Sequence, residues 1–174
     1  QETVEKQLQQ LELSHRSMVV FHYGTTWQTK LWSLKSWQQL VIRLVEQSDL
    51  LPLLTWGNDE EFKAVTAIAE ATAGRAIIWP RGRLPELVAL LAQVDLVVGC
   101  DTGPIHIAAA LGTPTVSLFR VTDAARNAPV GEIHRNLQTP MSCAGCLLKQ
   151  CDMDAQCAAS ISVADVYRAI LELT

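Results

Sequence analysis

The stretch with the clearest chemical potential runs from Asp101 to His106, where a carboxylate, a hydroxyl, a glycine and an imidazole follow a short apolar run. That run, residues 94–100, is rich in β-branched side chains, which is typical of a parallel strand covered on both faces. Pro104 favours a helix start, so we expect a helix over 105–111 directly after the strand. Open α/β sheets bind anionic ligands where a strand ends and a helix begins. The candidate ligand-binding residues here are Asp101, Thr102, Gly103 and His106.

A second candidate group, formed by Thr25, Thr26 and Lys30, follows an expected strand over 18–23. Backbone N–H groups, two hydroxyls and one ammonium group in such a loop suit a pyrophosphate. The loop matches neither the Gly-x-Gly-x-x-Gly fingerprint nor a Walker loop, which disfavours the classical dinucleotide and NTPase interpretations. The alternative for Lys30 is an ordinary solvated lysine.

Simpler interpretations exist for three of the candidate residues. Asp101 is at a position where a carboxylate often caps a helix, and His106 is alternatively a hydrogen-bonded histidine of a first helical turn. Glu61 follows Asn58 by three residues, which is close to a capping box, so its carboxylate either closes a helix start or serves a ligand. Glu60 is an alternative for the ligand role.

Four cysteines fall within 15 residues: Cys143, Cys146, Cys151 and Cys157. Four thiolates can bind zinc tetrahedrally, and the first pair has the spacing of a zinc knuckle. The second pair is spaced more widely than zinc ligands usually are, so free or partly oxidised thiols in a surface loop are an equal alternative. Cys100, inside an expected strand, is interpreted as a small buried hydrophobe.

Length and composition predict one compact domain. A chain of 174 residues with 49% hydrophobic content can bury a substantial core without disulfides or a metal. A net charge of -4 and a pI near 5.5 disfavour a nucleic-acid partner, so an anionic ligand has to be met by local positive charge. No apolar run approaches the ~20 residues that span a bilayer, and the polar first ten residues do not resemble a signal peptide. These features predict a cytoplasmic protein.

Strand and helix patterns alternate along the chain, which predicts a doubly wound parallel α/β sheet of Rossmann-like type. We expect the domain over 17–174, preceded by a linker or helix over 1–16. Ser33 is the expected cap of one helix, with Trp32 and Trp37 as its hydrophobic staple. The expected strands are 18–23, 50–56, 76–79, 94–100 and 115–119, and further helices are expected over 59–72, 84–93, 105–111 and 163–173.

Residues 101–106, followed by 108–114 and by Leu118 and Phe119, resemble the signature region of glycosyltransferase family 9, the lipopolysaccharide heptosyltransferases. Residues 21–26 with Lys30 and Trp32 resemble the first strand and donor-phosphate loop of that family, and Trp56 and Gly57 with Glu61 resemble its next strand end. The resemblance covers roughly 17–173 and corresponds to the carboxyl-terminal half of a family member. Family members combine two Rossmann-like halves in a GT-B arrangement, so we expect residues 1–16 to belong to the connection with the other half.

The resemblance implies an inverting heptosyltransferase whose donor is an ADP-sugar, most simply ADP-heptose. In such an enzyme Thr25, Thr26 and Lys30 contact the donor phosphates, Glu61 contacts the ribose, and Asp101 accepts from a sugar hydroxyl. For His106, the position in a first helical turn, where the helix dipole attracts an anion, favours a phosphate contact. The other half binds the lipopolysaccharide core acceptor and supplies the carboxylate base, so no catalytic base is expected in this chain. The chemistry requires no cofactor, and a structural zinc is the one metal considered. The inner face of the bacterial inner membrane, with peripheral membrane contact, is the implied location.

Two other classes of function stay open at this point. One is a nucleotide-sugar epimerase of GT-B shape, and the other is a noncatalytic, zinc-stabilised binding module. One departure bears on the donor: family members commonly carry Gly-Pro-Thr where this chain has Arg120, Val121 and Thr122. Arg120 either contacts a donor phosphate or a sugar carboxylate, or it narrows the pocket.

Overall fold

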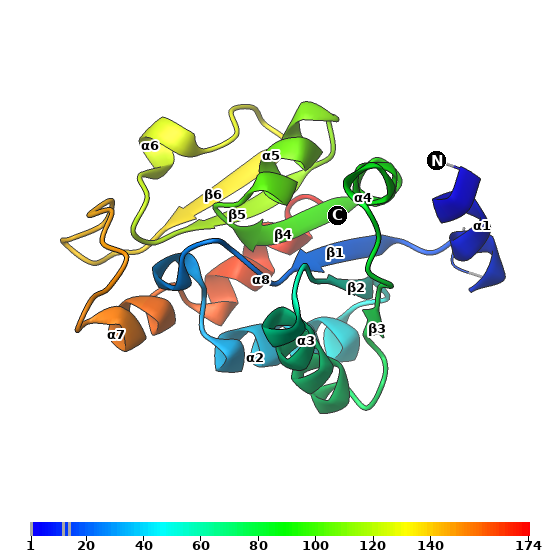
Figure 1. The fold of residues 1–174 in the computed structure, drawn as a ribbon, viewed down its shortest axis with the longest axis horizontal. Coiled ribbons are helices and arrows are strands. Elements are labelled where there is room, and N and C mark those ends of the chain that lie inside the picture. The colour runs from blue at the N-terminus through cyan, green and yellow to red at the C-terminus, as the bar shows by residue number, and fades with distance from the viewer. Residues whose placement is uncertain (1, 12, 14) are drawn as a thin grey trace.

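The computed structural model describes residues 2–11, 13 and 15–174 and contains one sheet of six parallel strands (Figure 1). The strands are β1 (Met18–His22), β2 (Leu51–Thr55), β3 (Ile77–Ile78), β4 (Leu96–Cys100), β5 (Thr115–Phe119) and β6 (His134–Gln138). Their order in the sheet is β3-β2-β1-β4-β5-β6, which is the order of a doubly wound dinucleotide-binding fold. The predicted fold class is confirmed.

Helices cover both faces of the sheet (Figure 1). They are α1 (Glu2–Gln10), α2 (Leu34–Gln47), α3 (Asp59–Ala71), α4 (Leu84–Leu91), α5 (Gly103–Ala110), α6 (Ala124–Asn127), α7 (Asp154–Ala159) and α8 (Val163–Leu171), with a short 3-10 helix, η1, at Gln28–Lys30. One hydrophobic cluster joins the sheet to α2, α3 and α8, and a second joins it to α1, α4 and α5. Two covered faces explain why the strands are apolar on both sides.

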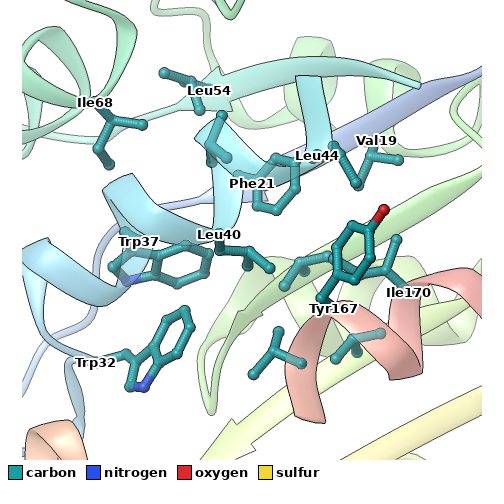
Figure 2. Close-up of a cluster of buried hydrophobic side chains, with 14 of the residues drawn as sticks. Val19, Phe21, Trp32, Trp37, Leu40, Leu44, Leu54, Ile68, Tyr167 and Ile170 are labelled. Atoms are coloured by element: carbon teal, nitrogen blue, oxygen red, sulfur yellow. The ribbon is translucent and has the colours of Figure 1, made fainter. Parts of the chain in front are cut away.

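The core under α2 is built around two tryptophans (Figure 2). Trp32 and Trp37 are each 1% exposed, and their ring centroids lie 5.3 Å apart in an edge-to-face arrangement. The hydroxyl of Ser33 accepts from the N–H of Ser36 and caps the helix. The predicted cap and staple are therefore confirmed, and together they fix the path of the chain from η1 into α2.

The topology reverses between β1 and β4, because the chain leaves these neighbouring strands in opposite directions, and we call the region outside their carboxyl ends the crevice. From β1 it passes through α2 to β2, and from β4 it passes through α5 to β5. His22 at the end of β1 is paired with Gly99 near the end of β4. Ligands of open α/β sheets bind outside the carboxyl ends of strands at such a reversal. Both candidate groups from the sequence follow these two strands.

The structure differs from the prediction at several elements. The sixth strand, β6, and the short helices α6 and α7 were not predicted, since their residues show neither an apolar alternation nor a helical stripe. β6 lies at the edge of the sheet and only His134 among its five residues is buried. Helix α5 begins at Gly103 rather than at residue 105, which places Pro104 in its second position.

Helix α1 packs against the sheet domain. Val4 is fully buried and Leu8 is 4% exposed, and both belong to the cluster that includes α4. In the part of the chain that the structure describes, no helix combines the length and the apolar character that crossing a membrane requires.

Buried histidines make the stability of this fold depend on pH. Burial lowers the pKa of His22 to about 4, and its Nδ1 lies 3.0 Å from the hydroxyl of Thr55. The unfolded chain, with an ordinary histidine pKa near 6.5, binds more protons than the folded chain between these two values. The free energy of unfolding therefore falls as the pH drops from about 6.5 towards 4, by roughly 3 kcal/mol for this one group.

We predict that His22→Gln flattens the fall in stability between pH 6.5 and 4, measured by urea unfolding at several pH values. The variant is less stable than the parent at neutral pH but has a weaker pH dependence. His15→Gln, at an exposed position, is the control and should leave the profile unchanged. An unchanged profile in His22→Gln would contradict this assignment.

Candidate functional site

Asp101 is the centre of the site. It directly follows β4, its side chain is 5% exposed, and groups from three other elements converge on its carboxylate. Lys30 Nζ lies 3.0 Å from Oδ2, His106 Nε2 lies 2.9 Å from Oδ1, and the side-chain amide of Asn127 donates to Oδ2 at 3.3 Å. Lys30 also donates to the Asp101 carbonyl at 3.2 Å. The structure thus brings Lys30, Asp101 and His106 into one network.

The network keeps the Asp101 carboxylate ionised. Burial alone would raise the pKa of Asp101, but hydrogen bonds from His106 and Lys30 outweigh that effect, and the pKa lies below the ordinary carboxyl value. The ammonium group of Lys30 is largely covered, whereas the His106 side chain is 45% exposed. An anion with several acceptor oxygens is therefore within reach of the Lys30 ammonium group and the His106 ring from the solvent side.

The start of α5 contributes the backbone N–H of Gly103, for which the described part of the chain offers no hydrogen-bond partner, whereas Pro104 has no N–H and those of Ile105 and His106 donate to the Thr102 carbonyl. Thr102 is the N-cap residue, and no side chain makes a capping hydrogen bond there. Gly103 is exposed, and a Cβ built on it would meet no atom within 4 Å. Both predicted residues thus border an open helix N-terminus, where N–H groups and the helix dipole favour an anion.

The loop after β1 forms a turn whose backbone is fixed by Thr25. Its hydroxyl accepts from the N–H of Trp27 at 3.1 Å and lies 3.2 Å from the Trp27 carbonyl. Thr26, next to it, is exposed. Lys30 ends the following 3-10 helix and points back to Asp101.

Glu61 closes the start of α3. The Asn58 side chain accepts from the N–H of Glu61 at 3.0 Å, and the Glu61 carboxylate accepts from the N–H of Gly57 at 2.6 Å and from the Asn58 amide at 2.8 Å. Glu61 therefore caps the start of α3, as one of its two interpretations predicted. Its carboxylate accepts from the backbone N–H of Gly57 rather than from that of the N-cap residue Asn58. A cavity of about 250 Å³ lies beside it and is lined by Tyr23, Thr25, Gln28, Leu31, Asn58, Glu60 and Glu61.

An aromatic group that was given no binding role from the sequence lies at the neighbouring strand ends. Trp56 directly follows β2, and its ring centroid is 4.6 Å from that of Phe62 and 5.8 Å from the Arg81 guanidinium carbon. Its indole N–H donates to the Trp79 carbonyl at 3.1 Å. A small cavity opens beside Trp56 at the ends of β2 and β3. The available signals were a tryptophan at the end of an expected strand and the resemblance of Trp56 and Gly57 to a strand end of the family.

Arg120 does not reach the crevice, which corrects the expectation that it contacts the donor or narrows the pocket. Its side chain is 1% exposed and donates to the carbonyl of Leu31 and to the carbonyl and carboxylate of Asp154, the last two at 2.8 and 2.6 Å. Arg120 thus joins the end of β5 to η1 and α7. Its role is structural, because its hydrogen bonds hold α7 next to η1.

The structure does not support the expected zinc site. Cys143 is exposed, Cys146 and Cys151 are partly exposed, and Cys157 is buried on α7 near Thr139, with its sulfur 3.9 Å from the hydroxyl. Over residues 2–11, 13 and 15–174, no group of three or more His, Cys, Asp or Glu side chains is arranged to hold a metal ion. Cys157 is thus buried on α7, whereas Cys143 is exposed. The interpretation as a zinc-stabilised module thereby loses its basis.

Comparison with known proteins identifies related sequences and folds. The sequence model of glycosyltransferase family 9 (heptosyltransferase) matches residues 1–156. Lipopolysaccharide heptosyltransferase 1 of Pseudomonas aeruginosa is 35% identical over 133 residues, which are 76% of this chain and 37% of that protein. The chain therefore spans less than half the length of this relative.

Solved structures show the same fold. The E. coli heptosyltransferase WaaC with ADP superposes with a TM-score of 0.76 at 24% identity, covering 98% of this chain and 48% of that one. WaaC with ADP-2-deoxy-2-fluoro heptose gives a TM-score of 0.72 at 26% identity, covering 91% and 44%.

Gly24, in the loop after β1, lies close to the Glu61 carboxylate at the start of α3. Its φ is +154°, and a Cβ built on it would lie 2.4 Å from the Glu61 carboxylate. We expect Gly24→Ala to lower the free energy of unfolding by about 1 to 3 kcal/mol, because the backbone is strained and Glu61 has to move. Gly103→Ala, with open space around the new methyl group, is the matched control. Equal stability of both variants in thermal unfolding would show that Gly24 is not constrained.

Proposed function

Because the chain belongs to glycosyltransferase family 9 (heptosyltransferase), we propose that it is the nucleotide-sugar-binding half of an inverting heptosyltransferase that acts on the lipopolysaccharide core. In this proposal residues 17–174 form the donor-binding domain, and residues 1–16 belong to the connection with an acceptor-binding half. The donor is an ADP-sugar, most simply ADP-heptose. The curated relative is a lipopolysaccharide heptosyltransferase, and one similar structure contains an ADP-heptose analogue.

The observation that carries the proposal is the convergence of Lys30 and His106 on the Asp101 carboxylate at the carboxyl ends of β1 and β4. Two cationic or hydrogen-bonding groups and an open helix N-terminus surround one point of the crevice. This combination suits a diphosphate, whose charge would otherwise be repelled by a protein with a net charge of -4. It lies where the fold class binds nucleotides.

Donor binding would exchange the partners within this network. Phosphate oxygens accept from Lys30, from His106, from the hydroxyls of Thr25 and Thr26 and from the N–H of Gly103. The Asp101 carboxylate then accepts from a hydroxyl of the sugar. The contacts of Lys30 and His106 with the Asp101 carboxylate are thereby replaced by contacts of similar strength with the phosphates. Little stabilisation of the fold is therefore lost on binding.

The nucleoside would extend from this point towards β2. Glu61 borders the 250 Å³ cavity next to Thr25, and its carboxylate oxygens are suited to the two hydroxyls of a ribose. Beyond it, the half-buried ring of Trp56 offers an aromatic surface at the ends of β2 and β3. The order diphosphate, ribose and base therefore follows the strand order β4, β1 and β2.

Transfer would need groups from outside this domain. As the bond between the anomeric carbon and the phosphate oxygen breaks, Lys30, the two threonines and the α5 N-terminus stabilise the negative charge on the leaving ADP. The acceptor hydroxyl loses its proton to a base that we assign to the other half, and it attacks the anomeric carbon from the opposite face. No cofactor is part of this proposal. We place the reaction at the cytoplasmic face of the inner membrane.

We predict that the chain binds ADP with an affinity in the micromolar to millimolar range, roughly -8 to -4 kcal/mol, measured by isothermal titration calorimetry. Lys30→Ala and His106→Ala should each weaken binding by about 1 to 3 kcal/mol, the usual loss of a charge-assisted contact. Lys35→Ala, an exposed lysine on α2, is the control for the loss of one charge.

The same preparation, incubated with ADP-heptose and heptose-deficient lipopolysaccharide, should bind the donor without turnover. Product mass and released ADP distinguish binding from transfer and from epimerisation. Equal ADP affinity in the parent and in both site variants would place the phosphates elsewhere. Catalytic turnover would show that the chain is more than a donor-binding half.

A further inference from the structure

Trp27 is contacted by two lysines from distant parts of the chain. The ammonium nitrogen of Lys30 lies 5.1 Å from the centroid of its ring, and that of Lys149 lies 4.8 Å from the same centroid. Trp27 is half-buried and lies in the loop between the two threonines and η1. Lys149 belongs to the cysteine-rich segment between β6 and α7, to which the proposed function assigns no role.

Specific contacts hold this segment against the loop. The buried hydroxyl of Thr29 donates to the Leu148 carbonyl at 2.7 Å, directly before Lys149. One residue further back, the N–H of Leu147 donates to the Val121 carbonyl at 2.8 Å. α7, which follows the segment, packs on η1 and is held by the Arg120–Asp154 pair (Figure 1). The backbone at Lys149 is therefore tied to the element that carries Lys30.

The two lysines differ in their charge environment. Lys30 is paired with the Asp101 carboxylate at 3.0 Å, so much of its charge is already compensated. Lys149 is exposed, and within the described residues no carboxylate lies within 4.0 Å of its ammonium group. A diphosphate carries more than one negative charge, and Asp101 adds another to the same region. A second, uncompensated cation at this place offsets that repulsion.

We propose that Lys149 is a second diphosphate-binding residue, which the cysteine-rich segment carries to the donor site beside Lys30. The inference rests on the proposed function. In the free protein both ammonium groups lie near the Trp27 ring. An exposed cation–π contact is weak, so each ammonium group can leave the ring for a phosphate oxygen at little cost.

The experiment is calorimetric titration of the chain with ADP at low and at physiological ionic strength. Lys149→Ala should raise the Kd for ADP about fivefold to tenfold at low ionic strength and less at higher ionic strength, because an exposed charge is screened by salt. Lys149→Arg, which keeps the charge and the contact with the ring, should restore the Kd to within about twofold of the parent. Lys35→Ala should leave it unchanged. Melting temperatures of all variants report whether the segment stays in place.

The outcomes separate this inference from the proposed function. ADP binding by the parent that Lys30→Ala weakens and Lys149→Ala does not would overturn the role of Lys149 and leave the proposed function standing. A loss in Lys149→Ala that Lys149→Arg does not restore would assign the residue a steric role and would also overturn the inference. Absence of ADP binding by the parent would overturn both.

Discussion

The site is organised by one buried carboxylate. Asp101 directly follows β4, and its two oxygens hold Lys30 from η1, His106 from α5 and Asn127 from α6. Removing a carboxylate from water costs several kcal/mol, so the residue is tolerated at 5% side-chain exposure only because these donors satisfy it. The contacts with Lys30 also hold the loop that follows β1 next to the end of β4. Without this carboxylate, Lys30 and His106 would lose the hydrogen bonds that orient their side chains towards the crevice.

A layer of supporting contacts surrounds this centre. Trp32 and Trp37 fix how the chain enters α2 after η1, and Arg120 ties η1 from below to β5 and α7. The side chains of Trp32, Trp37 and Arg120 are almost fully buried. They therefore position the site from within the fold rather than by contact with a ligand. The hydrogen bond from Thr29 to the Leu148 carbonyl and the packing of α7 on η1 hold the segment between β6 and α7 next to η1, which is the basis for assigning it a binding role.

Local signals predicted much of this arrangement. The apolar runs and their turns gave five of the strands and the parallel sheet, and the short-range caps at Ser33 and Asn58 are formed as expected. The missing element β6 is an edge strand with mixed polarity, so its pairing depends on β5 rather than on its own sequence. The contacts of Lys149 and Arg120 join residues far apart in the chain, and only the folded structure shows them. Cysteine spacing alone predicted a zinc site that the structure does not support, because the orientation of α7 decides where the Cys157 side chain points.

The most direct test of the account is an NMR titration of the isotopically labelled chain with ADP, following backbone amide shifts. We predict that the largest shifts fall on residues 24–30 and 102–106, on the two sides of the Asp101 carboxylate. A different and larger hollow lies outside the amino ends of the strands, beside His15, Arg16, Ser17, Asp49 and Leu50. Shifts centred on that hollow, with residues 24–30 and 102–106 unaffected, would contradict the assignment of the crevice as the donor site.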